Sequence, residues 1–230
     1  HYRSHYLINA IEVLEQPGLR RKFAQEPGVA LVLFQPGMRR YPRSFSLPAV
    51  DPTGPQGVEW NVRQVRAEQV WQQGYTGQGV IVGNADTGVV WDHPALKPSY
   101  RGWDAFKGEA VSHDYYWYDA WDDRAEPWDD NGHGTHTLGI VVGQDGANRV
   151  GLAPGGRWIA CRNMRHGVGT PGSYLSCMEF LLAPFPLDGD ALQDGDPAQG
   201  AQIVNNSWGC PRQEGCRPET LRLAVEHLRA

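Results

Sequence analysis

The sequence predicts an α/β fold in which helices cover both faces of a parallel sheet, preceded by a small α+β unit. Residues 80–86 (VIVGNAD) and 157–161 (RWIAC) are nearly continuous apolar runs, as expected for strands buried on both faces. Strand and helix candidates also alternate along the second part of the chain, which is typical of a parallel sheet. Sites in such sheets form at the carboxyl ends of the strands, so functional residues are expected there.

The first part of the chain reads as a small α+β unit. It contains a strand candidate at 6–13, a Pro17-Gly18 break, a helix candidate with Leu19 and Phe23 on one face, and a strand candidate at 29–34. Residues 39–57 follow with four prolines, two glycines and no sustained periodicity, the composition of a linker. We therefore divide the chain into residues 1–41, a linker at 42–59, and residues 60–230.

In the second part, a helix candidate at 65–73 is closed by Gly74, and the strand at 80–86 follows. A helix begins within 133–143, and the strand at 157–161 precedes a helix at 174–183. Residues 201–209 read as a strand running into a turn, and 218–228 as a helix with Leu221, Val225 and Leu228 on one face. The aromatic, acidic residues 103–128 fit no period, which leaves two interpretations: a binding loop, or a long surface insertion held by its own aromatic side chains.

Composition argues against two classes of partner. The chain has 230 residues, 40% of them hydrophobic, and a formal net charge of −5. Nucleic acids and anionic membranes attract basic surfaces, and no apolar run approaches the roughly 20 residues of a membrane helix. We therefore expect a soluble globular protein with neither partner. Because the chain starts at His1 rather than Met and stops within a helical pattern at Ala230, we also expect a piece of a longer protein.

The four cysteines favour disulfides. Cys210 and Cys216 flank a short loop that a disulfide could close, and Cys161 and Cys177 complete the set. The C-x2-C spacing common in zinc sites is absent, and four unpaired thiols are the remaining alternative. Disulfides would place the protein in an oxidising compartment, although four cysteines allow three pairings.

Asp86 and His133 are the candidates for acid–base chemistry. Asp86 ends a buried strand, and His133 lies between two glycines at the start of a helical run. A neutral imidazole can accept a proton near neutral pH, and a carboxylate on its other nitrogen would fix the tautomer. The rival is a zinc site on His133 and His136, but the H-E-x-x-H pattern is missing because Gly134 follows His133. We expect no metal there and a packed, structural His136.

These blocks together resemble the subtilisin-like serine proteases (subtilases, peptidase family S8), and within them bacillopeptidase F-like members. The matching stretches over residues 60–230 are GYTGQGVIVGNADTGVVWDHPAL, NGHGTHTLG, GLAPGGRWIAC and IVNNSWG, in the order of the family. The order Asp, His, Ser is that of the subtilisin triad. The resemblance implies a partial subtilisin-like fold in a secreted endopeptidase, with Asp86 as the orienting acid and His133 as the general base.

The resemblance also implies a substrate groove and an inhibitor. Ser207, Trp208 and Gly209 would pair with an extended peptide as an added strand, and Gly167 and Gly169 belong to the opposite wall. Residues 1–41 resemble the carboxyl-terminal half of an inhibitory propeptide, and 42–59 would be the activation loop. The implied partners are a peptide or protein substrate, the chain's own propeptide and a carboxyl-terminal part of the catalytic domain.

Two departures from the family limit what this chain can do. It contains neither the G-T-S-M block of the nucleophile nor the A-G-N block of the oxyanion asparagine, so we expect the chain alone to be inactive. Many subtilases have a calcium ligand in an H-P-D-L motif, where this chain has Ala95. The acids of 119–130 could form a different calcium site, Asp130 could line a pocket, and we expect most to be solvated charge. The alternative function is a non-catalytic, subtilase-like peptide-binding module.

Overall fold

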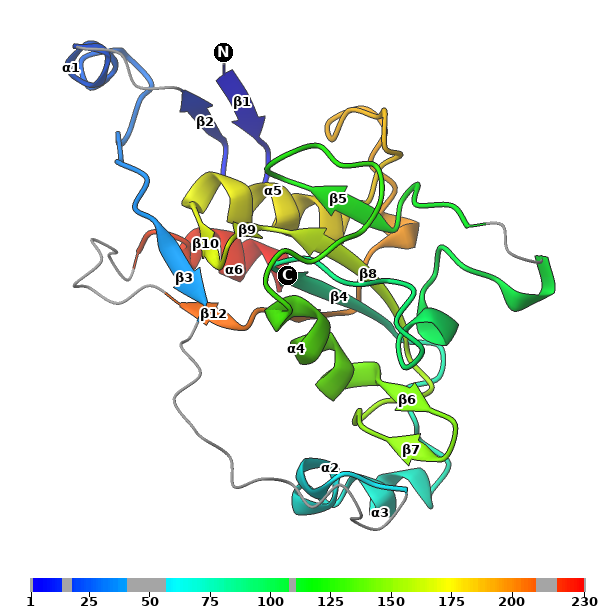
Figure 1. The fold of residues 1–230 in the computed structure, drawn as a ribbon. Coiled ribbons are helices and arrows are strands. Elements are labelled where there is room, and N and C mark those ends of the chain that lie inside the picture. Colours follow the sequence, from blue (N-terminus) through cyan, green and yellow to red (C-terminus); the bar gives the residue numbers. More distant parts are fainter. Residues whose placement is uncertain (1, 14–17, 41–56, 108–110, 210–218, 230) are drawn as a thin grey trace.

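The computed structural model describes residues 2–13, 18–40, 57–107, 111–209 and 219–229, and its centre is a four-stranded parallel sheet (Figure 1). The strand order is β11 (Ile203–Asn205), β4 (Ile81–Asp86), β8 (Arg157–Arg162) and β5 (Trp117–Asp119). Helix α5 (Pro171–Leu182), with α6 (Arg222–Leu228) against it, lies on one face, and α4 (His133–Val142) lies on the other. The α/β fold expected from the sequence is confirmed.

The side chains of β4 and β8 alternate between two hydrophobic clusters, one on each face of the sheet. The cluster beneath α4 contains Val82, Trp158, Ala160, Leu138 and Val142. The cluster beneath α5 contains Ala85, Ile159, Cys161, Phe180 and Leu181. Asn84 and Asp86 are two and four positions from Val82 on β4, so they lie on the α4 side of the sheet.

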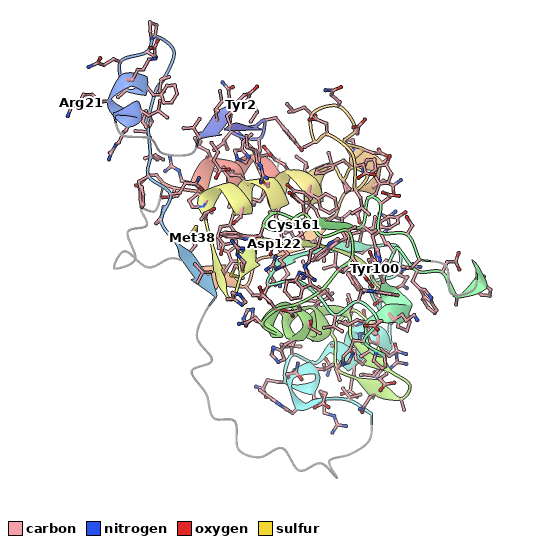
Figure 2. All side chains as sticks on the ribbon, turned by 45° about the horizontal axis from the view of Figure 1, so that its top comes forward. Tyr2, Arg21, Met38, Tyr100, Asp122 and Cys161 are labelled. Atoms are coloured by element: carbon pink, nitrogen blue, oxygen red, sulfur yellow. A yellow bond between two sulfur atoms is a disulfide. The ribbon has the colours of Figure 1, made fainter. Side chains whose placement is uncertain are left out.

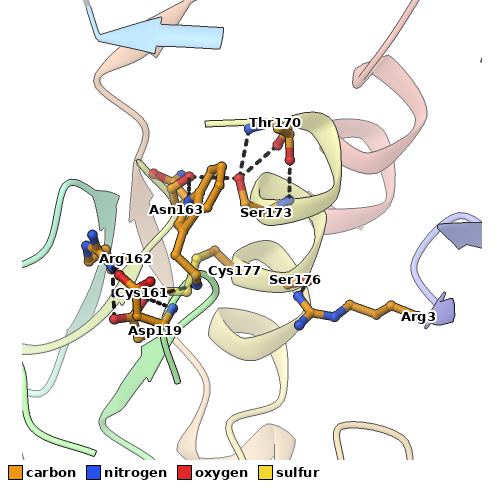
Figure 3. The surroundings of a disulfide bond; sticks show 11 residues. Arg3, Asp119, Cys161, Arg162, Asn163, Thr170, Ser173, Ser176 and Cys177 are labelled. Carbon is orange, nitrogen blue, oxygen red and sulfur yellow. Dashed lines mark hydrogen bonds and ion pairs between the residues drawn. A yellow bond between two sulfur atoms is a disulfide. The ribbon is translucent and has the colours of Figure 1, made fainter. Parts of the chain in front are cut away.

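A disulfide between Cys161 and Cys177 joins β8 to α5 within the second cluster (Figure 3). The Cα atoms of the two cysteines are 5.5 Å apart, within the range that a disulfide spans. Both cysteines were candidates for disulfide bonding, but spacing alone left their pairing open. Cys210 and Cys216, which we expected to close a short loop, lie outside the described residues.

A second, antiparallel sheet contains a strand from the first part of the chain. Its order is β12 (Trp208–Gly209), β3 (Met38–Arg40), β10 (Val168–Gly169) and β9 (Met164–Arg165). Arg39 lies opposite both Val168 and Gly209, and Met38 lies opposite Gly169. Strand β3 therefore lies between two short strands of residues 60–230, as Figure 1 shows.

The first part of the chain differs from the strands expected from its sequence. Strands β1 (Tyr2–His5) and β2 (Ala10–Val13) form an antiparallel hairpin, so a single strand over 6–13 is wrong. The chain turns at 6–9, where Asn9 has a φ of 50°. Helix α1 (Leu19–Phe23) is present as predicted. The strand predicted at 29–34 is absent, because none of the described strands pairs with this segment and its side chains are largely exposed.

Three expectations for the second part also need correction. The helix predicted at 65–73 is the shorter α3 (Ala67–Trp71), and a separate helix that was not predicted, α2 (Trp60–Gln64), precedes it, since Arg66 between them has a left-handed φ of 59°. Residues 103–128 are not a surface insertion, since they supply strand β5 and the buried Trp117. On α6, Ala224 is buried in place of the exposed Val225. The remaining elements are η1 (Lys97–Ser99), η2 (Ala105–Lys107), β6 (Gln144–Asp145), β7 (Asn148–Arg149) and η3 (Pro197–Gln199).

Candidate active site

Asp86 and His133 meet at the carboxyl end of the central sheet. Asp86 is the last residue of β4 and is fully buried, while His133 is the first residue of α4 and its side chain is 12% exposed. The His133 Nδ1 atom lies 2.7 Å from Asp86 Oδ1. A carboxylate only accepts hydrogen bonds, so Nδ1 is the donor and Nε2 is left as the nitrogen that can take a proton.

The Asp86 carboxylate is fixed by two further donors. The backbone N–H of Thr87 donates to Oδ1 at 2.7 Å, and the Thr137 hydroxyl can donate to Oδ2 at 3.3 Å or to the Gly134 carbonyl oxygen at 3.1 Å. Since Oδ1 accepts from both Thr87 and His133, the carboxylate cannot turn away from His133 without breaking these hydrogen bonds. The imidazole is consequently held in one orientation by a rigid, buried acid.

The first turn of α4 is fitted closely to the end of β4. A Cβ atom at Gly134 would collide with the carbonyl oxygen of Gly88, so only glycine lets the helix approach this near. Asp129 fixes the turn before the helix: its carboxylate accepts the N–H groups of Gly132 and Thr135 at 2.9 Å each, among other donors. A carboxylate at a helix amino terminus is also favoured by the helix dipole.

The groove residues predicted from the sequence lie along strand β3. Gly169 lies opposite Met38, Gly209 opposite Arg39 and Trp208 opposite Arg40. Gly167 comes just before β10 with a φ of 78°, which favours glycine. Ser207 comes just before β12, and its hydroxyl donates to Asn205 Oδ1 at 3.1 Å. The structure thus brings these residues together around an extended segment of the chain itself.

The Met38 side chain packs in an apolar cluster next to α5 (Figure 2), and we call the space that it fills the recess of Met38. Its side chain is 5% exposed and belongs to a cluster that includes Met164 and Tyr174, with Trp208 packed against it. The rings of Tyr174 and Trp208 lie 3.9 Å apart between centroids. The flexible, apolar side chain of Met38 thus fits among these residues.

Two of the acids in 119–130, Asp119 and Asp130, are buried against an arginine, which corrects the expectation of solvated charge for these two. The Arg162 side chain is fully buried at the end of β8, and its guanidinium contacts Asp119, Asp122 and Asp130 at 2.6 to 3.0 Å. Figure 3 shows the pair Arg162 and Asp119. The hydrogen bond from Arg162 lowers the pKa of Asp122. In the described part of the chain, no group of three or more His, Cys, Asp or Glu side chains could hold a metal ion.

Sequence reasoning placed one histidine wrongly and missed several residues. His136 is exposed on α4, so the expectation that it packs is wrong. Asn84, Asp129 and Arg162 were missed. Asn84 and Arg162 carried a readable signal, because each is a polar residue in an otherwise apolar strand. The partners of these residues come from distant segments, so only the fold reveals them.

Comparison with known proteins identifies the class. The model of the subtilase family, peptidase S8, matches residues 77–228, and the chain belongs to this family. Bacillopeptidase F of Bacillus subtilis (strain 168) is 39% identical over 216 residues, which cover 90% of this chain and 14% of that protein. Thermophilic serine proteinase of Bacillus sp. (strain AK1) is 28% identical over 177 residues, 75% of this chain and 35% of that protein.

A third relative is named as an extracellular protease. Minor extracellular protease Vpr of Bacillus subtilis (strain 168) is 32% identical over 151 residues, 63% of this chain and 16% of that protein. The chain spans well under half the length of each of these three relatives. None of the helices in the described ranges is both long and apolar enough to cross a membrane.

Proposed function

We propose that this chain is part of a subtilisin-type serine endopeptidase, with Asp86 as the orienting acid and His133 as the general base. The observation that carries the proposal is the 2.7 Å contact between Asp86 Oδ1 and His133 Nδ1, at the end of a buried parallel sheet. Because Asp86 holds Nδ1 as the donor, Nε2 is free to take a proton from a nucleophile. Membership of the subtilase family supports the same assignment.

The proposed reaction is acyl transfer to serine. His133 Nε2 removes the proton of a serine hydroxyl as its oxygen attacks the peptide carbonyl, and then gives that proton to the leaving amine. Water, activated by His133 in turn, hydrolyses the acyl-enzyme. These steps use side chains and water, so we infer that catalysis needs no cofactor. The G-T-S-M and A-G-N blocks are not in this sequence, so a serine and an oxyanion donor supplied downstream would complete the site.

Substrate is proposed to bind as an extended strand between β10 and β12. The backbone of β3 already pairs with Gly169 and Gly209 in this way, which supports an added-strand mode of binding. The recess of Met38, beside Tyr174 and Trp208, then favours an apolar substrate side chain at the corresponding position. Gly167 and Ser207 would lie at the ends of the two groove walls.

The first part of the chain is proposed to be an inhibitory propeptide segment. Its strand β3 occupies the space that substrate would take, and its hairpin contacts α5: Arg3 Nη1 donates to Ser176 Oγ at 3.1 Å. Residues 42–59 would then be the activation loop. The buried Cys161–Cys177 disulfide and the extracellular relative support a secreted protein.

The free side of β11 supports a further intramolecular partner. This strand pairs with β4 on one side only, within the described residues, and Ile203 on it is exposed. Unpaired apolar edges invite another strand. We infer that a carboxyl-terminal part of the catalytic domain covers this edge and brings the nucleophile to His133. We also propose a structural calcium ion in that complete domain. Asp119, Asp122 and Asp130 would not be its ligands, because their carboxylates already contact Arg162.

The second candidate is a subtilase-like module that binds peptide strands without cutting them. The observation that favours it is the occupied groove, in which β3 pairs on both sides. Affinity would then come from strand pairing alone.

Labelling with a fluorophosphonate separates the two candidates. We expect the complete parent protein to be labelled after removal of its first segment, its His133→Ala variant to be labelled far more slowly, and this 230-residue chain to stay unlabelled. An unlabelled, folded parent that still binds peptides would support the binding module and overturn the protease. Labelling of this chain would overturn the proposal that its nucleophile lies downstream.

A further inference from the structure

Asn84 is a buried amide on the face of β4 that also bears Asp86. It is 1% exposed, and apolar residues of this face, among them Val82 on β4 and the opposite Ala160 on β8, lie beside it. Burying an amide among apolar side chains is unfavourable unless its donors and acceptor are hydrogen-bonded. The partners of Asn84 therefore explain why the position is polar.

The amide of Asn84 joins two parts of the candidate site. Its Nδ2 donates to the carbonyl oxygen of Gly134 at 3.2 Å, in the first turn of α4 directly after His133. Its Oδ1 accepts from Asn205 Nδ2 at 2.9 Å, at the end of β11. One side chain thus holds both the helix of the base and the neighbouring strand.

Each of these two contacts leads to a further hydrogen bond, one near the groove wall and one at the start of α4. Asn205 Oδ1 accepts from the Ser207 hydroxyl at 3.1 Å, just before groove strand β12. On the other side, the N–H of Gly134 donates to the Thr87 hydroxyl at 2.9 Å, so Gly134 is held at its N–H as well as its carbonyl. A continuous set of hydrogen bonds therefore runs from α4 through Asn84 and Asn205 to the groove wall.

We propose that Asn84 is a positioning residue that fixes the distance between His133 and the groove wall at Ser207 and Trp208. This proposal rests on the proposed protease function. Peptide hydrolysis needs the bound carbonyl and the general base in a fixed relation, and misplacement by about 1 Å can cost roughly a hundredfold in rate. An aliphatic residue at 84 would fill the space but leave the Gly134 carbonyl and the Asn205 amide without this link.

Two variants test the two ends of this set of hydrogen bonds separately. Asn84→Leu removes both contacts, whereas Asn205→Ala removes only the contact on the groove side and leaves Asn84 bonded to Gly134. In the complete parent, we expect Asn84→Leu to lower kcat by ten- to a hundredfold for extended peptides, with KM also raised. We expect Asn205→Ala mainly to raise KM. Asn148→Leu, at an exposed position on β7, is the matched control and should change neither constant.

A second measurement needs no catalysis. The proton between His133 Nδ1 and Asp86 Oδ1 should give a downfield NMR signal in the 230-residue chain, because the hydrogen bond is short and its acceptor is a carboxylate. We expect Asn84→Leu to shift or broaden this signal and Asn205→Ala to leave it nearly unchanged. If Asn84→Leu does not fold, Asn84→Ala replaces it, since alanine also lacks the groups that bond to Gly134 and Asn205.

The outcomes separate the two proposals. A parent that lacks protease activity, with the His133 signal still moved by Asn84→Leu, would overturn the proposed function but support the coupling of Asn84 to His133. An active parent in which Asn84→Leu lowers the melting temperature alone, with kcat, KM and the His133 signal unchanged, would show that Asn84 is merely structural and would overturn this inference.

Discussion

The Nδ1 atom of His5 lies 3.2 Å from Oε2 of Glu179, so the amino-terminal hairpin is joined to α5 through two buried side chains. The other oxygen of Glu179 accepts the N–H of Leu7 at 3.0 Å, and Glu12 approaches the far side of the imidazole at 3.5 Å. Burial alone would lower the pKa of His5, but the two carboxylates raise it from 6.5 to about 9. His5 is therefore a cation while the hairpin is docked.

This arrangement predicts a pH-dependent hairpin. Because the pKa of His5 is raised on docking, its contribution is fully present below pH 6.5 and is lost as the pH rises through about 9. The pKa of Glu12 is lowered by His5, so its contribution disappears only in acid. We expect His5→Gln to lower the free energy of unfolding by on the order of 1–3 kcal/mol at pH 6.5 and by much less at pH 9.5.

Denaturant unfolding of both proteins at the two pH values measures this difference. His166→Gln is the control, because the His166 side chain is 78% exposed. A His5→Gln penalty that stays constant between pH 6.5 and 9.5 would show that His5 acts by packing and not by its charge.

Part of this fold could be predicted from local patterns in the sequence. The strands at 81–86 and 157–162 were predictable because their apolar runs are buried whatever surrounds them. The segment at 29–34 has the same composition but forms no strand, because strand formation needs a partner that the described residues do not supply. β5 was missed because aromatic and acidic residues surround it, and only its pairing with β8 makes it a strand.

Some residues of the candidate site could likewise be predicted from the sequence, and others could not. Asp86, His133 and the groove residues could be proposed from the sequence, because their motifs resemble those of the subtilase family and occur in the order of that family. Arg162 was not, since Asp119, Asp122 and Asp130 lie 32 to 43 positions earlier and nothing local indicates that they converge. The burial of Asp119 and Asp130 was therefore not expected, and only the fold brings these two carboxylates to the Arg162 guanidinium.

Arg162 should be among the most sensitive positions for stability. Arg162→Met would leave Asp119 and Asp130 buried without their cation, and such broken pairs cost about 3–5 kcal/mol of unfolding free energy. Arg162→Lys keeps the charge but loses the planar fork, so a smaller loss is expected. Denaturant unfolding at pH 7 measures both variants. Arg165→Met is the control, because Arg165 is about half exposed and should cost less than about 1 kcal/mol. Equal effects of Arg162→Met and Arg165→Met would contradict the buried-cluster interpretation.

Met38 should determine how firmly β3 stays in the groove. Its side chain is the buried apolar contact of a strand of only three residues, and removing a buried methionine side chain costs about 2–5 kcal/mol. We expect Met38→Ala to free β3 more often, so that amide hydrogen exchange at Gly169 and Gly209, which lie opposite β3, becomes at least about tenfold faster. Leu33→Ala is the matched control, because Leu33 belongs to the same segment but is exposed. If both variants accelerated exchange equally, β3 would be held by its backbone and not by the recess of Met38.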